Sequence, residues 1–136
     1  MTDPTVYVPA DAVDLVRQFL ADRVPAKFPG VRVAANLSPK WTPTTLPAEL
    51  VLFDDSGPMN WPVETRPQIR GTVWADGHAT AVAVAGYALG LLLCQRVPGI
   101  AKILPGSSLL EARDERTGGL MCSFTVRTRV RTVPAT

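Results

Sequence analysis

The clearest pattern along the chain is a change of period near residue 76. Between residues 66 and 75 apolar and polar positions alternate, and the apolar positions are Ile69, Gly71, Val73 and Ala75. A period of two predicts a half-buried strand. The run from 79 to 94 has no charged residue, and it predicts a buried helix for which Asp76 stands at the N-cap position. We expect one face of this helix on the sheet and the other against a first helix or a neighbouring subunit.

Weaker patterns predict one more helix and several strands. Apolar residues at helical spacing predict an amphipathic helix from Asp11 to about Val24, and Pro25 is expected to end it. Alternating or apolar runs predict strands at residues 31–37, 49–54, 100–104, 109–113 and 120–133, with the last two forming a hairpin. A crossover through the central helix is expected to join strand 66–75 to a later strand beside it. This order predicts an α/β fold of the α+β two-layer type, in which two helices pack on one face of a mixed four- to five-stranded sheet.

Length and composition limit the number of domains and the class of partner. A chain of 136 residues is expected to form a single domain over 1–136, with 1–10 as an extended N-terminal arm and 11–133 as the folded part. The net charge of +2 favours neither a nucleic acid nor an acidic partner for the chain as a whole. The uncharged run is too short for a membrane span, and the N-terminus lacks the pattern of a secretory signal, so we expect synthesis in a reducing cytoplasm. Cys94 and Cys122 are interpreted as free buried thiols, with a disulfide as the alternative.

The titratable residues that could form a catalytic or metal site are few, namely Asp54, Asp55, Glu64, Asp76 and His78. Asp54 and Asp55 precede Ser56-Gly57, a composition typical of a turn, and Asp76 is expected to cap the central helix. The chain has no glycine-rich phosphate loop after a strand and no nucleophile elbow. We therefore predict no catalytic residue, no metal site, no cofactor and no enzymatic activity.

Two groups of residues are candidates for contacts with other molecules. The first is a set of large apolar residues in predicted loops, Trp41, Met59 and Trp61, which either fold back on the core or contact a partner. The second is a row on one face of the last predicted strand, formed by Arg127, Arg129 and Arg131. Such a row is typical of a solvated strand face, and the alternative is contact with nucleic-acid phosphates. Both groups are treated as interface residues.

Over about residues 11–133, the layout resembles the tail terminator (tail completion) proteins of long-tailed bacteriophages. The resemblance is carried by the opening helix DAVDLVRQFLADRV, a VRV strand, and the strand ELVLF with the long loop after it. It continues with the strand that ends Val73-Trp74-Ala75, the alanine-rich helix directly after it, and the C-terminal strand FTVRTRVRTV. The junction VWAD followed by ATAVAVA is its most telling part.

The resemblance implies a structural virion protein without catalytic residues. It would form a homohexameric ring that caps the head-proximal end of the tail tube, ends tube polymerisation and joins the tail to the head. Its partners would be copies of itself, the major tail tube protein and a head-side connector or completion protein. DNA would only pass as cargo, and no membrane would be involved. The protein would be assembled in the host cytoplasm and located at the neck of the virion.

Alternative functions are also considered. A head-tail connector or head-completion protein of the neck would bind the portal side instead of the tail tube. A small cytoplasmic ligand-binding protein or enzyme would use the acidic group and His78. A nucleic-acid binder would use the arginine row.

Overall fold

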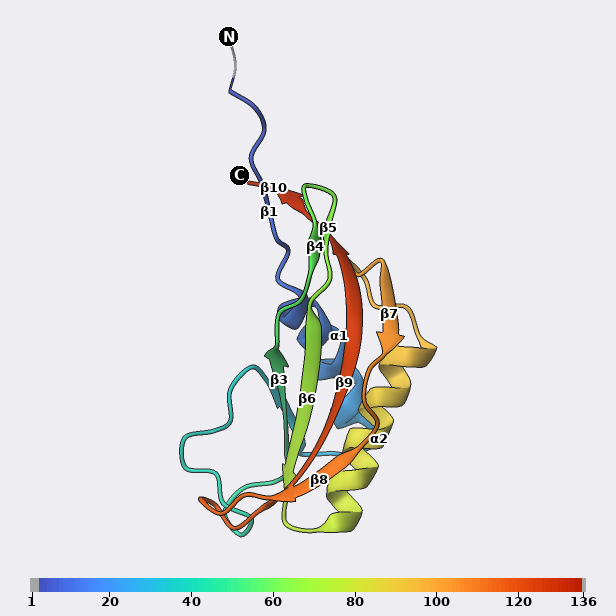
Figure 1. Cartoon of the computed structure of the whole chain (residues 1–136). Helices are drawn as coiled ribbons and strands as arrows, with labels where there is room; N and C mark the ends of the chain where they lie inside the picture. The colour runs from blue at the N-terminus through green and yellow to red at the C-terminus, as the bar shows by residue number, and fades with distance from the viewer. Residues whose placement is uncertain (1–2, 136) are drawn as a thin grey trace.

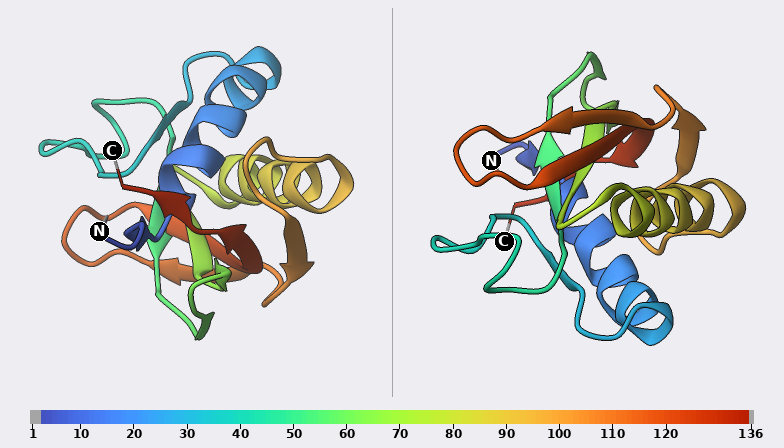
Figure 2. Two further views of the ribbon diagram at one scale, coloured as in Figure 1. Left: turned by 90° about the horizontal axis from the view of Figure 1, so that it is seen from above. Right: turned by 90° about the horizontal axis from the view of Figure 1, so that it is seen from below.

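The alternating segment at the centre of the chain forms the central strand, β6 (Gln68–Ala75), and the uncharged run after it forms helix α2 (His78–Cys94). The computed structural model describes residues 3–135. Helices α1 (Ala12–Lys27) and α2 lie together on one face of a mixed sheet (Figure 1; Figure 2). The predicted α+β two-layer class, with both helices on one face, is therefore confirmed.

The sheet has eight strands, more than the four or five predicted, because short segments join it at both sides. Its strands are β2 (Arg32–Ala34), β3 (Glu49–Asp54), β4 (Met59–Asn60), β5 (Glu64–Thr65), β6, β7 (Lys102–Pro105), β8 (Leu110–Arg113) and β9 (Leu120–Arg131). The order is β2-β3-β6-β9-β5-β4, and β7 and β8 also pair with β9. The β2–β3 pair is parallel and the others are antiparallel. A separate ribbon joins the arm to the C-terminal segment through β1 (Tyr7–Val8) and β10 (Val133–Pro134).

The crossover through α2 differs from the prediction in one respect. The chain leaves β6, passes through α2 and enters β7, but β7 does not lie beside β6. Strand β9 pairs with β6 and with β7, so it occupies the place between them. The hairpin β8–β9 supplies this inserted strand from later in the chain.

Two predicted helix boundaries are wrong. Helix α1 starts after Asp11, which caps it by accepting from the Asp14 amide at 3.0 Å, but it continues past Pro25 to Lys27. The φ angle of proline fits a helix, and close to the end its missing N–H costs only one hydrogen bond. At α2 the N-cap is Gly77 and no side chain caps the helix, so Asp76 lies one residue too early for the predicted role.

The main core lies between the sheet and the helices. The predicted stripe of α2 is buried there in full, as Ala81, Ala85, Ala88 and Leu92. Gly71 and Phe124 are cross-strand partners, and a Cβ atom on Gly71 would come within 2.4 Å of the Phe124 ring. The aromatic ring therefore fills the space that the glycine leaves in β6.

A second side of α2 meets α1, which is one of the two alternatives expected for it. The Phe28 ring, just after α1, contacts the Tyr87 ring edge-on at 5.8 Å, and the Lys27 ammonium lies 5.3 Å from the centre of the same ring. No helix within residues 3–135 is long and apolar enough to span a membrane.

Candidate interaction surfaces

The face of the sheet opposite the helices is covered at one end by the proline-rich loop 35–48. Trp41 from this loop is only 2% exposed and packs with Val51 and Trp74 of the strands beneath it. Its indole N–H donates to the Pro47 carbonyl at 2.8 Å. Of the two alternatives for the loop tryptophans, Trp41 follows the first, because it folds back on its own sheet and leaves no free surface for a partner.

A buried carboxylate anchors the start of this loop. Glu49 is 3% exposed, and its Oε1 accepts from Arg32 Nη1 at 2.9 Å and from the Ser38 amide at 3.0 Å. The same guanidinium nitrogen donates to the Asn36 carbonyl at 2.9 Å. Because a buried charge is stable only when it is paired and hydrogen-bonded, these contacts fix where the loop leaves β2.

Exposed apolar side chains gather at the opposite end of the sheet. Of the nine large hydrophobic side chains exposed within residues 3–135, six lie on the β1–β10 ribbon or next to it and on the β4–β5 hairpin, namely Val6, Tyr7, Met59, Trp61, Val63 and Val133. We call these six residues the apolar end. The two parts adjoin, since the Thr132 amide donates to the Val63 carbonyl at 3.2 Å. Both project from the top of the molecule in Figure 1.

Met59 and Trp61 do not fold back on the core, and their exposure fits the alternative that they contact a partner. Met59 is 64% exposed and Trp61 47% exposed. The hairpin that carries them pairs with the end of β9, through Thr65 opposite Val130. Large apolar side chains that are exposed on an ordered hairpin are typical of a contact surface.

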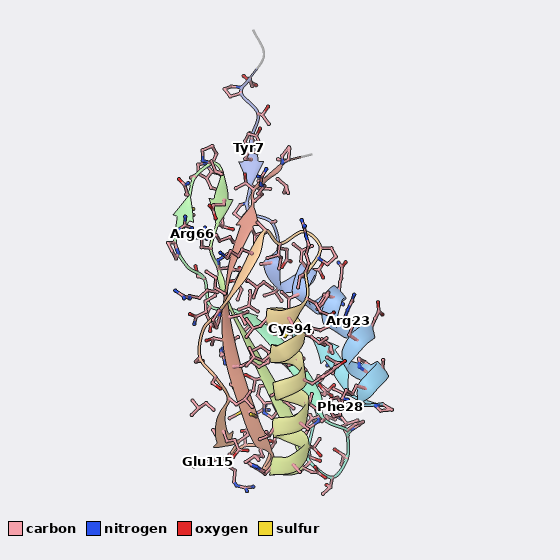
Figure 3. All side chains as sticks on the ribbon, turned by 90° about the vertical axis from the view of Figure 1, so that its right-hand side faces the viewer. Tyr7, Arg23, Phe28, Arg66, Cys94 and Glu115 are labelled. Carbon is pink, nitrogen blue, oxygen red and sulfur yellow. The ribbon has the colours of Figure 1, made fainter. Side chains whose placement is uncertain are left out.

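The arginine row lies where the alternation places it. Arg127, Arg129 and Arg131 are exposed on β9, whereas the alternate residues of that strand are buried under the helices. Arg127 Nε lies 3.4 Å from the Pro105 carbonyl of the neighbouring strand. Arg66 joins the row from the link between β5 and β6, and Figure 3 shows it at the same end as Tyr7 and far from Glu115.

The titratable residues considered for catalysis do not form one site. Asp54 accepts from the Ser56 amide at 2.7 Å, but the predicted turn is wrong, because the backbone here runs beside the start of β6 and the Asp55 amide donates to the Gln68 carbonyl at 2.8 Å. Asp55 pairs with Arg70 at 3.2 Å. Among residues 3–135 no group of three His, Cys, Asp or Glu side chains is placed to hold a metal ion.

The other members of that set are engaged separately or stand alone. Glu64 lies 3.5 Å from Arg66, and His78 contacts Glu111 of β8 through Nδ1. Asp76 is exposed in the link between β6 and α2.

The two cysteines are free, but only one of them is buried. Cys122 faces the core from β9, and burial, with the nearby charge of Glu111, raises the pKa of its thiol. Cys94 is exposed in the last turn of α2, so its predicted burial is wrong. The last turn leaves Cys94 and its neighbour Leu93 on the solvent side of the helix.

Several residues of these surfaces were not singled out from the sequence. Val6, Tyr7, Val63 and Val133 join the apolar end through strands of two residues or the turns beside them, and such segments are too short to show a period. The only signal available was the unusual density of large apolar residues among prolines and turn formers in 6–8 and 59–63.

Comparison with known proteins gives a likeness in structure but none in sequence. No family model matches the chain, and no curated protein matches it in sequence. A solved structure described as "Virion of native gene transfer agent (GTA) particle" contains a chain of similar fold, with a TM-score of 0.66 and 20% sequence identity. The match covers 90% of this chain and 99% of that chain. The two chains thus share a fold over nearly the whole length of the virion chain.

Proposed function

We propose that this chain is a structural protein of a phage-like virion and, more specifically, a tail terminator. In this function it forms a homohexameric ring on the head-proximal end of the tail tube, stops tube polymerisation and presents a surface to the head-side connector. Its partners are further copies of itself, the major tail tube protein and the connector. It is assembled in the host cytoplasm and stays at the neck of the particle.

The observation that carries the proposal is the shared fold with a chain of a gene transfer agent virion, which extends over 99% of that chain. Agreement over a whole chain means that the virion protein contains little beyond this fold. A virion protein that consists largely of one small domain contacts its neighbours through the surface of that domain. The resemblance of the sequence to tail terminators points to the same class of particle.

The apolar end supports contact with neighbouring protein. Monomeric proteins rarely leave large apolar side chains grouped together, because each exposed side chain loses the roughly 1.5–3 kcal/mol that burial gives. Here Met59, Trp61 and Val63 follow one another closely on a hairpin, and each is about half exposed or more. Tryptophan and methionine are also enriched in the buried centres of protein interfaces. We assign the apolar end to the contact with an adjacent subunit or with the tail tube.

The test is the mass of the purified protein in solution, alone and with the tail tube protein of the same particle. The expected result is a hexamer, or a monomer that becomes a ring on tube ends. A double variant, Met59→Ser with Trp61→Ser, is expected to remove ring formation and tube capping while the monomer stays folded. The matched control is Leu110→Ser, which changes a 71% exposed apolar residue on β8 and is expected to change neither.

Two results would count against the proposal. A protein that stays monomeric and does not bind the tail tube would contradict the proposed ring. A ring that binds portal-side protein and leaves tube length unregulated would assign the chain to the connector class instead.

A further inference from the structure

We propose that the chain binds the phosphate backbone of double-stranded DNA through a strip of cations on the end of the sheet near β9. The strip consists of Arg66, Arg96, Lys102, Arg127, Arg129 and Arg131, and we call it the basic strip. Its members come from four separate places in the sequence, so only the fold brings them together. The basic strip would be the side of the protein that faces DNA. In that respect the inference rests on the proposed function and extends it.

Three adjoining hollows make the strip continuous. The first, of about 240 Å³, is lined by Arg66, Arg127 and Arg129 among its residues. The second shares Arg129 with it and adds Lys102 and Arg131. The third shares Arg131 and adds Arg96, which follows α2. Neighbouring hollows thus share one arginine of the strip.

The charge of the strip is almost uncompensated. Glu64 is the only carboxylate that lines the three hollows, and its contact with Arg66 at 3.5 Å is the only ion pair that the strip makes within residues 3–135. The chain has 14 basic and 12 acidic residues in all. With six cations and one carboxylate gathered here, the other residues carry an excess of acidic groups. A nearly neutral protein thus presents one strongly positive surface.

The geometry of the row suits a partner with regularly repeated negative charges. Arg127, Arg129 and Arg131 are alternate residues of one strand, so their Cα atoms recur about every 6.7 Å along β9. Double-stranded DNA carries one negative charge per about 1.7 Å of its axis, so a cation at each step along the strand meets phosphate. Arginine donates several hydrogen bonds in a fixed plane and binds phosphate with two of them.

The lining of the strip favours phosphate over an acidic protein surface. Protein interfaces have aromatic and aliphatic side chains at their centre, and in this chain those side chains are on the apolar end. Of the nine exposed large hydrophobic residues, Val63 alone lines one of the three hollows. The residues between the cations include polar or small ones, such as Gln68, Thr128 and Ala101, and the apolar Leu104 and Ile100 that also line the hollows are half-buried and buried. Among the residues that the structure describes, no aromatic side chain that could stack on a base lines the three hollows, and contacts to phosphate carry no sequence information, so we expect binding to be independent of DNA sequence.

The experiment is a titration of labelled 20-base-pair DNA of random sequence, followed by fluorescence anisotropy between about 50 and 300 mM salt. Neutralising Z phosphates gives a slope of about −0.9Z in log K against log salt, so six cations allow a slope down to about −5. The double variant Arg129→Ala with Arg131→Ala is expected to weaken binding at least about tenfold at low salt and to make the slope shallower by about 2. The variant Arg129→Lys with Arg131→Lys is expected to keep the slope.

The matched control is Arg113→Ala with Arg116→Ala, two exposed arginines at the β8–β9 end, which is expected to bind DNA as the unchanged protein does. All the substituted residues are exposed, and circular dichroism checks that each variant is folded. The proposal is overturned if the unchanged protein does not bind DNA, if the control weakens binding equally, or if a poly-glutamate peptide of the same charge binds as tightly as DNA. Solution mass reports the ring separately, so failure of DNA binding and failure of the proposed ring are distinguishable.

Discussion

The proline-rich loop 35–48 and the β4–β5 hairpin each carry a tryptophan among turn-forming residues, but the two side chains differ in burial. Trp41 is 2% exposed, whereas Trp61 is 47% exposed. Trp41 lies over Val51 and Trp74, which are outward-facing residues of β3 and β6, and its N–H has a carbonyl acceptor. A loop tryptophan is thus buried where the strands beneath it offer an apolar floor and an acceptor.

Toward their other end the apolar surface of the same strands is already covered by a side chain of the sheet itself. There the outward-facing residues of β3 and β6 are Phe53 and Arg70, and the Arg70 guanidinium lies 4.2 Å from the centre of the Phe53 ring. Beyond them the basic strip begins, and the hairpin extends past the main core (Figure 1). The two tryptophans therefore have different surroundings, because Trp41 covers the sheet and Trp61 stays exposed to solvent.

Replacing each tryptophan in turn gives the largest expected contrast. Trp41→Ala removes a buried indole and leaves a cavity between the loop and the sheet, so we expect the free energy of unfolding to fall by about 3–5 kcal/mol. Trp61→Ala removes an exposed indole, and we expect a change within about 0.5 kcal/mol. Urea unfolding at 25 °C measures both. Equal losses in the two variants would mean that Trp61 is packed in solution and is not available to a partner.

A smaller effect is expected from the carboxylate that holds the loop. Glu49→Ala leaves the Ser38 amide without its buried acceptor and frees Arg32, and an unsatisfied buried group costs about 1–3 kcal/mol. The matched control is Asp55→Ala, which removes the exposed partner of Arg70, and it is expected to cost at most about 1 kcal/mol. The free energies of unfolding of the two variants provide the measurement. If Glu49→Ala costs no more than the control, the loop is not anchored by this pair.

The central part of the fold was predictable because its residues obey one period for long enough. The alternation before residue 76, the uncharged helix after it and the alternating strand β9 that carries the arginine row all extend over eight residues or more. Strands β1, β4, β5 and β10 have two residues each, so no period could show them. The predicted N-cap, Asp76, was wrong by one residue, because composition does not tell at which of two neighbouring residues a helix begins.

The candidate surfaces were predictable only in part, for a different reason. The row of three arginines follows from alternation along one strand, but Arg66, Arg96 and Lys102 join it through tertiary contacts between distant segments. The burial of Trp41 and Trp61 depends on which strands lie beneath each loop, and the order of strands in a sheet cannot be predicted from local composition. Met59 and Trp61 remain predicted interface residues, and their role awaits the association measurement.

The smallest expected effect concerns acid, at the turn that supports the floor under Trp41. Burial opposes ionisation of Asp114, but hydrogen bonds from the Trp74 indole at 3.0 Å, the Thr117 hydroxyl at 2.9 Å and the Arg116 amide at 3.0 Å outweigh it, and the pKa is lowered. A lowered pKa in the folded state means that ionised Asp114 stabilises the protein above the unfolded value near about 3.9, and that this contribution is lost as pH falls through the folded pKa. Asp114→Asn is therefore expected to be less stable than the unchanged protein at pH 7, by about 1 kcal/mol.

The difference between the two proteins is expected to shrink below about pH 4 and to vanish at lower pH. Thermal melting of both proteins from pH 7 to pH 2.5 measures it. Other carboxylates, including Asp14 with its pKa lowered by Arg17 and Gln18, titrate in both proteins and cancel in the comparison. A difference that stays constant through this range would show that Asp114 acts through the shape of the turn and not through its charge. In that case the geometry of the hydrogen bonds that Asp114 accepts, and not its ionisation, would stabilise the floor under Trp41.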